Sequence, residues 1–207
     1  MTDATAFERT IANGGVAVFP ADTVYGLACA PDDAAAVARL YALKGRPPDK
    51  PAAVMFFDRD RALAALPELG ERTRTALEAL LPGAVTLLLP NPRRRYPLAC
   101  GPDPETLGFR VPALPALSAV TVPVLQSSAN AAGEPDARRL ADVPEGIRAG
   151  ADLVIDGGEL PGTPSTVIDL RGYERDGGWR VLRIGAVAPG AVATVLSPPP
   201  AHASEEP

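Results

Sequence analysis

The sequence predicts a single α/β domain on a twisted, open sheet of mixed parallel and antiparallel strands with flanking helices. Three observations predict this class. Apolar runs of strand length alternate with amphipathic, helix-like segments along the 207-residue chain. The second half is richer in strands, which favours a mixed sheet. No internal repeat or linker divides the chain, and its length suits one self-supporting core. We place the domain at residues 1–196 and expect residues 197–207, which are rich in proline and lack an apolar period, to be a disordered tail.

Helix and strand signals alternate in the first half of the chain. Phe7 and Ile11 share a face of the opening helix. Asp32 or Asp33 can cap the next helix, which Gly45 stops. We expect strands over residues 16–19, 52–57 and 85–89, and helices over residues 4–13, 34–44, 61–66 and 72–81.

Strands dominate the second half. We expect strands over residues 106–111, 122–126, 153–155, 166–170 and 179–184, a short helix over 114–120, helical material within 138–148 and a last helix over 190–196. Polar loops follow strands or bound helices at residues 22–25, 44–50, 127–130 and 162–166. Because open α/β sheets place ligand sites in such loops, we expect the four loops to converge on one site.

Histidine is absent from the predicted domain. The single histidine, His202, lies in the predicted tail, which excludes Ser-His-Asp and Cys-His catalysis. With only Cys29 and Cys100 besides, no ordinary zinc site can form. Any chemistry must therefore use arginine, lysine, carboxylates, hydroxyls and backbone amides.

The first residues, the apolar runs and the net charge limit the cellular location and the partners that we expect. The first residues do not resemble a signal sequence, the cysteines form no CxxC motif, and no apolar run approaches about 18 residues, so we expect a cytoplasmic protein that does not enter a membrane. The formal net charge of −5 gives no support to nonspecific nucleic-acid binding. We interpret the three arginines in the loop over residues 91–97 as solvated surface charge. The alternative is a weak contact of this loop with RNA.

Lysine is used in one place only. The chain has 18 arginines but two lysines, Lys44 and Lys50, which flank Arg46. Two explanations account equally well for this distribution. One is a biased composition, and the other is a need for the compact point charge of an ammonium group. The standard phosphate fingerprints GxxxxGK[ST] and GxGxxG are absent. The three basic side chains could instead bind a polyphosphate together with Ser128 and Asn130, although a local turn also explains the latter two.

Seven motifs occur in a recognisable order. They are residues 19–27 (FPADTVYGL), 44–51 (KGRPPDKP), 81–87 (LPGAVTL), 107–112 (LGFRVP), 128–130 (SAN), 165–167 (STV) and 183–185 (RIG). Each motif is weak alone, but the ordered set resembles the threonylcarbamoyl-AMP synthase family, the YrdC-like proteins, over about residues 10 to 190. The length matches the short, single-domain form of that family.

The resemblance implies a nucleotidyltransferase that condenses L-threonine, bicarbonate and ATP into threonylcarbamoyl-AMP and pyrophosphate. Mg²⁺ would accompany ATP without a protein-bound metal site, and other tRNA-modification proteins would use the product. By position, the resemblance assigns threonine binding to Thr23, Tyr25, Arg110 and Ser165; nucleotide binding to Arg46, Lys50, Thr106, Ser128, Asn130 and Arg183; and catalysis to Lys44 and Arg46.

Several positions depart from the family pattern. This chain has Ala21, Met55, Leu114, Gln126, Ser127 and Asp136 where the family commonly has other residues. Met55 removes a polar partner, and Asp136 would repel a triphosphate unless it meets Mg²⁺ or turns away. Two alternatives therefore stay open: a non-catalytic paralogue that binds nucleotide or RNA, and a carbamoyl-adenylate enzyme with another acceptor.

Overall fold

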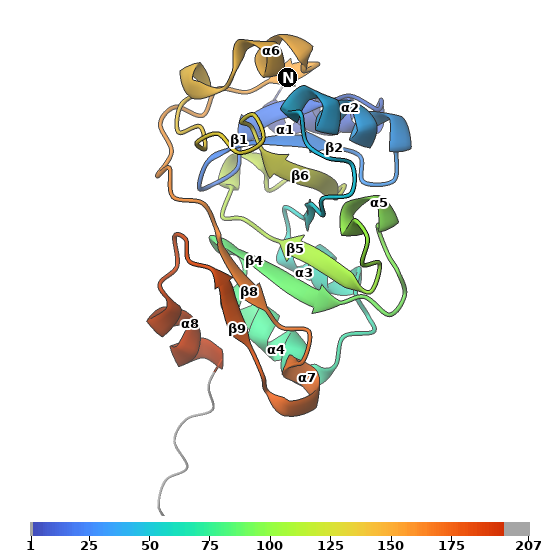
Figure 1. Cartoon of the computed structure of the whole chain (residues 1–207), viewed down its shortest axis with the longest axis vertical. Coiled ribbons are helices and arrows are strands. Elements are labelled where there is room, and N and C mark those ends of the chain that lie inside the picture. Colours follow the sequence, from blue (N-terminus) through green and yellow to red (C-terminus); the bar gives the residue numbers. More distant parts are fainter. Residues whose placement is uncertain (1, 197–207) are drawn as a thin grey trace, which may run out of the picture.

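A computed structural model describes residues 2–196 and confirms the predicted fold class (Figure 1). One mixed sheet has the strand order β7-β1-β2-β6-β3-β5-β4-β8-β9. The strands are β1 (Ala17–Pro20), β2 (Tyr25–Cys29), β3 (Ala53–Met55), β4 (Val85–Pro90), β5 (Thr106–Arg110), β6 (Val124–Ser128), β7 (Leu153–Val154), β8 (Thr166–Asp169) and β9 (Arg180–Arg183). Neighbours β1–β7, β3–β5 and β4–β8 are parallel and the other pairs are antiparallel. The predicted tail, residues 197–207, lies outside the described residues.

Helices and short helical turns connect the strands. They are α1 (Asp3–Ala12), α2 (Ala34–Lys44), α3 (Arg59–Ala64), α4 (Glu71–Leu80), α5 (Pro97–Cys100), η1 (Pro115–Leu117), η2 (Leu140–Asp142), α6 (Glu145–Gly150), α7 (Tyr173–Asp176) and α8 (Pro189–Leu196). None of these is long and apolar enough to cross a lipid bilayer, a finding that covers residues 2–196.

The two faces of the sheet bury different sets of side chains. Along β1, Val18 belongs to the larger core, which also contains Leu40 of α2, while Phe19 belongs to a smaller core that contains Phe7 of α1. This is the two-residue alternation of a strand with apolar partners on both faces. The rings of Phe7 and Phe19 lie 5.1 Å apart between centroids, so aromatic packing fixes α1 against the sheet.

The predicted caps define where the loop after α2 begins. Of the two candidate aspartates, Asp33 caps α2, and its Oδ1 accepts hydrogen bonds from the amides of Ala35 and Ala36 at 2.9 and 3.0 Å. Gly45 ends the helix with a positive φ of 59°, a conformation that costs glycine little. The backbone therefore turns sharply between Lys44 and Arg46 and directs their side chains differently.

Some predicted elements were wrong. The expected loop over residues 22–25 runs into β2, which was not predicted; it pairs with β1 on one side and β6 on the other, so tertiary pairing defines it. Likewise β6 extends through Ser128, which was assigned to a loop. The expected helix over residues 114–120 is a single 3-10 turn. The four-residue helices α5 and α7 are too short for a periodic pattern to reveal them.

Candidate functional site

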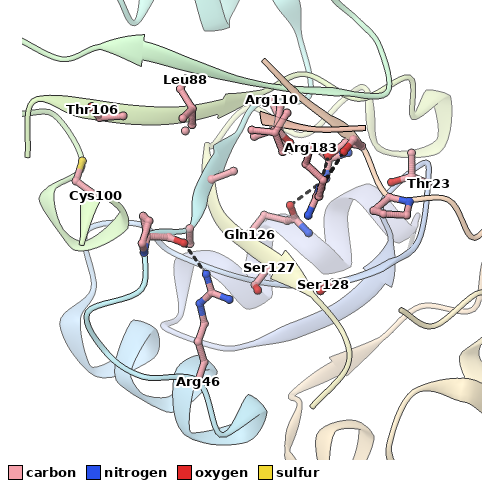
Figure 2. A pocket seen from close by; sticks show the side chains of 18 of the residues that line it. Thr23, Arg46, Leu88, Cys100, Thr106, Arg110, Gln126, Ser127, Ser128 and Arg183 are labelled. Carbon is pink, nitrogen blue, oxygen red and sulfur yellow. Dashed lines mark hydrogen bonds between the residues drawn. The ribbon is translucent and has the colours of Figure 1, made fainter. Parts of the chain in front are cut away.

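A cavity of about 360 Å³ opens over the middle of the sheet (Figure 2). It is lined from β3, β4, β5, β6, β8 and β9 and from the loops after β1 and α2. Seven of the residues proposed for the site line it: Thr23, Arg46, Thr106, Arg110, Ser128, Ser165 and Arg183. The four polar loops, far apart in sequence, therefore contribute to one concave site.

Arg110 forms the buried centre of this site. It ends β5, and its side chain is only 5% exposed. Its Nη2 donates to Asp22 Oδ1 at 2.9 Å, and its Nη1 donates to Gln126 Oε1 at 3.0 Å. Burial raises the pKa of Asp22, an effect that the positive charge of Arg110 opposes. The ion pair is thus largely buried, which makes it sensitive to any further charge nearby.

Three buried polar atoms of this ion pair and of Thr23 have no hydrogen-bond partner among residues 2–196. Arg110 Nε is buried and makes no hydrogen bond within the described chain. Thr23 Oγ1 lies close enough to the Asp22 carboxylate to lower its pKa, yet neither Thr23 Oγ1 nor Asp22 Oδ2 completes a hydrogen bond there. A buried unsatisfied polar atom costs roughly 1–3 kcal/mol, so such a group of atoms is typical of a ligand site.

A second guanidinium faces the same space (Figure 2). Arg183 Nη2 donates to the carbonyl oxygen of Ser165 at 2.8 Å and to its hydroxyl at 3.2 Å, and that hydroxyl lies 2.7 Å from Thr86 Oγ1. Burial lowers the pKa of Arg110, and the nearby charge of Arg183 adds a smaller effect in the same direction. Arg110, Arg183 and Asp22 together carry one net positive charge, which favours an anionic group in the cavity.

Arg46 lies on the opposite wall, in the loop after α2. Its Nη2 donates to the carbonyl oxygen of Pro51 at 2.5 Å (Figure 2), and its guanidinium lies 5.8 Å from the centre of the Tyr41 ring. Asp136 and Ser128 line the cavity with it. Since Nη1 of Arg46 is not engaged by any contact in the described residues, the side chain can still donate to a phosphate.

Lys44 lies beneath this wall and does not line the cavity. Its ammonium donates to the carbonyl oxygens of Ser128 and Asn130 and, at 2.8 Å, to Asn130 Oδ1. Ser128 Oγ also donates to Asn130 Oδ1, at 2.6 Å. Burial lowers the pKa of Lys44 to about 8. Lys44 and Asn130 thus hold together the end of β6, where Ser128 lies, and the turn that follows it.

Two further candidates lie outside the cavity. The Tyr25 hydroxyl is 3.0 Å from Asp156 Oδ1 and 2.9 Å from the carbonyl oxygen of Gly158, so it fastens the loop after β7. Lys50 is exposed, and its carbonyl oxygen accepts a hydrogen bond from Tyr41. The structure does not bring either side chain to the group around Arg110.

Thr106 lies at the far end of the cavity, near Cys100. Its hydroxyl donates to Asp103 Oδ2 at 2.6 Å, and Arg171 Nη1 lies 3.3 Å from the same hydroxyl. Leu88 of β4, which pairs with Gly108 of β5, adds an apolar surface between Thr106 and Arg110. A flat, partly apolar group with polar edges would fit on this surface.

Sequence reasoning missed three residues of the site as ligand-binding candidates. Asp22, Thr86 and Gln126 surround Arg110 and Ser165. The signal for Gln126 was present, because a polar residue interrupts the apolar run of β6. Asp22 lies in the polar loop over residues 22–25 that was expected at the site, but its residue type is common in surface loops, and Thr86 gave no signal.

Comparison with known proteins identifies the family. The Sua5/YciO/YrdC family model, described as telomere recombination, matches residues 9–185. Threonylcarbamoyl-AMP synthase of Chromohalobacter salexigens is 37% identical over 180 residues, which cover 84% of this chain and 94% of that protein. The corresponding protein of Xanthomonas campestris is 35% identical over 177 residues, covering 82% and 94%. The chain therefore belongs to the Sua5/YciO/YrdC family.

Solved structures agree with this assignment. Pyrococcus abyssi Sua5 in complex with L-threonine is 30% identical with a TM-score of 0.79, and the match covers 93% of this chain and 56% of that one. Escherichia coli YciO is 26% identical with a TM-score of 0.73, and the match covers 89% and 90%. The chain thus resembles a short family member along nearly the whole of both chains.

Proposed function

We propose that this protein is an L-threonylcarbamoyladenylate synthase, which makes threonylcarbamoyl-AMP and pyrophosphate from L-threonine, bicarbonate and ATP. The observation that carries the proposal is the cavity itself, with a two-guanidinium pocket around Arg110 and Arg183 on one wall and Arg46 on the other. Synthases at 35–37% identity and the L-threonine complex of a structural relative support it.

The pocket around Arg110 suits the two charged ends of an amino acid. The net positive charge and the unpaired Nε of Arg110 favour a carboxylate. The unpaired Oδ2 of Asp22 would accept a hydrogen bond from an amino group beside it, and Thr23 and Ser165 offer hydroxyls. We therefore assign threonine binding to this wall of the cavity.

The opposite wall suits ATP. Arg46 and Ser128 can donate to phosphate oxygens, and the apolar end near Thr106 can hold a nucleobase. Asp136 faces the same space, and a carboxylate with phosphate oxygens is the donor set that Mg²⁺ accepts, so the residues present fit an ATP-borne ion. The ion, when bound, would neutralise the phosphate charge that Asp136 alone would repel.

The reaction needs no side-chain nucleophile. The amine of threonine attacks the carbon of CO₂ and loses a proton, or attacks bicarbonate with release of water, and either route gives a carbamate. A carbamate oxygen then attacks the α-phosphorus of ATP, and pyrophosphate leaves. Such phosphoryl transfer depends on positioning and charge neutralisation. Arg46 would stabilise the phosphates and Arg110 would hold the threonine carboxylate, while Lys44 would hold the end of β6 at Ser128 in place. Other tRNA-modification proteins would then use the adenylate.

Pyrophosphate release tests this proposal. Purified protein with ATP, Mg²⁺ and bicarbonate should release pyrophosphate only when L-threonine is added. Arg46→Ala should lower the rate by about 10²–10³-fold, the usual effect of removing a charge-stabilising donor. Arg95→Ala is the matched control, because Arg95 pairs with Glu68 away from the cavity and should keep the wild-type rate. A wild-type protein without threonine-dependent release is not a synthase.

The same assay separates the alternative functions. The similarity to YciO along nearly the whole chain favours, as the alternative, a paralogue with another activity. Release that depends on bicarbonate and on a different amine or carbamoyl acceptor would identify a carbamoyl-adenylate enzyme. Binding of ATP or RNA without any release would identify a non-catalytic paralogue.

A further inference from the structure

Gln126 occupies an unusual place in the middle of β6. Its side chain shares a face of the sheet with its cross-strand neighbours, Ala28 of β2 and Ala53 of β3, which leave space above the strand. The residue is only 5% exposed and lines the cavity. A buried amide costs free energy unless it is hydrogen-bonded, and the contact that Gln126 makes is with Arg110.

Gln126 and Asp22 hold the guanidinium of Arg110 from two sides. The carboxylate of Asp22 engages Nη2 and the amide oxygen of Gln126 engages Nη1, at 2.9 and 3.0 Å. Two points of attachment fix both the position and the plane of the group. Nε remains unpaired.

The two partners differ in charge, and this difference matters for binding. Asp22 cancels one positive charge, whereas Gln126 accepts a hydrogen bond without cancelling any. Arg110 and Arg183 with Asp22 therefore keep one net positive charge; Arg110 and Asp22 are buried, whereas Arg183 is exposed. A second carboxylate in place of Gln126 would remove it, and an anionic ligand would lose its attraction to the pocket.

We propose that Gln126 is a positioning residue: it orients Arg110 for the carboxylate of the amino-acid substrate while leaving the charge of the guanidinium available. The proposal rests on the proposed function for the identity of the ligand. The orientation of Arg110 by Gln126 does not depend on that function and can be measured without any ligand.

Two near-isosteric variants test the ligand effect by calorimetric titration. Gln126→Met removes the acceptor and should weaken L-threonine binding about tenfold, the loss expected for one hydrogen bond to a charged group. Gln126→Glu keeps an acceptor but neutralises the pocket and should weaken it further. The affinity for ATP with Mg²⁺ should stay within about twofold in both variants, because that ligand is assigned to the opposite wall.

The outcomes distinguish a failed inference from a failed function. L-threonine affinity in Gln126→Met within twofold of the wild type, or equal losses for both ligands, would overturn the inference. A wild-type protein that binds no L-threonine would overturn the proposed function instead. In that case ¹⁵N NMR of the unliganded protein decides the matter: the Arg110 Nε–H signal, assigned by its absence in Arg110→Lys, should shift or broaden in Gln126→Met. An unchanged signal would show that Gln126 does not position Arg110. If Gln126→Met does not fold, Gln126→Leu, which also lacks the acceptor, takes its place.

Discussion

At the scale of single residues, Arg110 shows which part of a side chain's role follows from the sequence and which part depends on the fold. Strand alternation places Arg110 on the face opposite Phe109, and that much follows from the sequence. Whether that face meets solvent or lines a cavity depends on Asp22, 88 positions away, and on Gln126 of β6, 16 positions away. The ordered motifs predicted Arg110 as a site residue, but they did not predict Asp22 and Gln126 as its hydrogen-bond partners.

The buried pair of Arg110 and Asp22 leads to a prediction for stability. Arg110→Met should lower the free energy of unfolding by about 3–5 kcal/mol, because it leaves a buried carboxylate without its counter-ion. The double variant Arg110→Met, Asp22→Asn should be more stable than the single variant, since no charge then remains unpaired. Urea denaturation measures both, with Arg95→Met, at the more exposed pair with Glu68, expected to cost about 1 kcal/mol or less. A double variant no more stable than the single one would contradict this account.

At the scale of elements, local signals explain helices better than strands. Asp33 and Gly45 directly flank α2 in the sequence, and the helix begins and ends as predicted. β2 contains glycine and alanine and has few strand-forming residues, and it exists because β1 and β6 supply backbone partners on both sides. Its absence from the prediction follows from that non-local cause.

The β8–β9 hairpin gives a prediction for acid stability. Asp169 of β8 faces Arg180 of β9 in register, and its Oδ2 lies 2.8 Å from Arg171 Nη2 and 3.0 Å from Arg180 Nη2. The hydrogen bonds from Arg171, with the help of Arg180, hold the pKa of Asp169 well below its usual range. A lowered carboxyl pKa contributes stability that is fully present above the unfolded value of about 4 and is lost as the pH falls below it.

Asp169→Asn should therefore reduce the free energy of unfolding by about 1–2 kcal/mol at pH 7, a modest figure because both arginines are partly exposed. The difference from the wild type should shrink as the pH is lowered from 5 toward 2. Urea denaturation across this range measures it. Asp176→Asn, at the exposed pair with Arg175, is the control and should leave stability at the wild-type value. A difference that stays constant with pH would show that the charge of Asp169 is not involved.

At the scale of the whole molecule, one sheet brings distant parts of the chain to one cavity. Thr23 and Arg183 are 160 positions apart in sequence, and both line it. The alternation of elements predicted the fold class, and the polar loops predicted one shared site. The strand order, in which β6 lies between β2 and β3, was not predictable, because nothing in a local pattern specifies which strands become neighbours.

The shared sheet predicts one cooperative unfolding transition. Trp179, the single tryptophan, packs against the larger core beside β9, whereas far-UV circular dichroism reports on all elements. The two signals should change at the same temperature, because the sheet is continuous from β7 to β9.

Binding of ATP gives a second prediction for thermal unfolding. ATP with Mg²⁺ at about 100 times its dissociation constant should add about 2.7 kcal/mol to the free energy of unfolding and raise the transition temperature by roughly 5–10 °C. Arg46→Ala should lose most of this increase while keeping the unliganded transition, since its guanidinium faces the cavity rather than a core. Two separate transitions, or a ligand shift seen by only one of the signals, would show that the two ends of the sheet unfold independently.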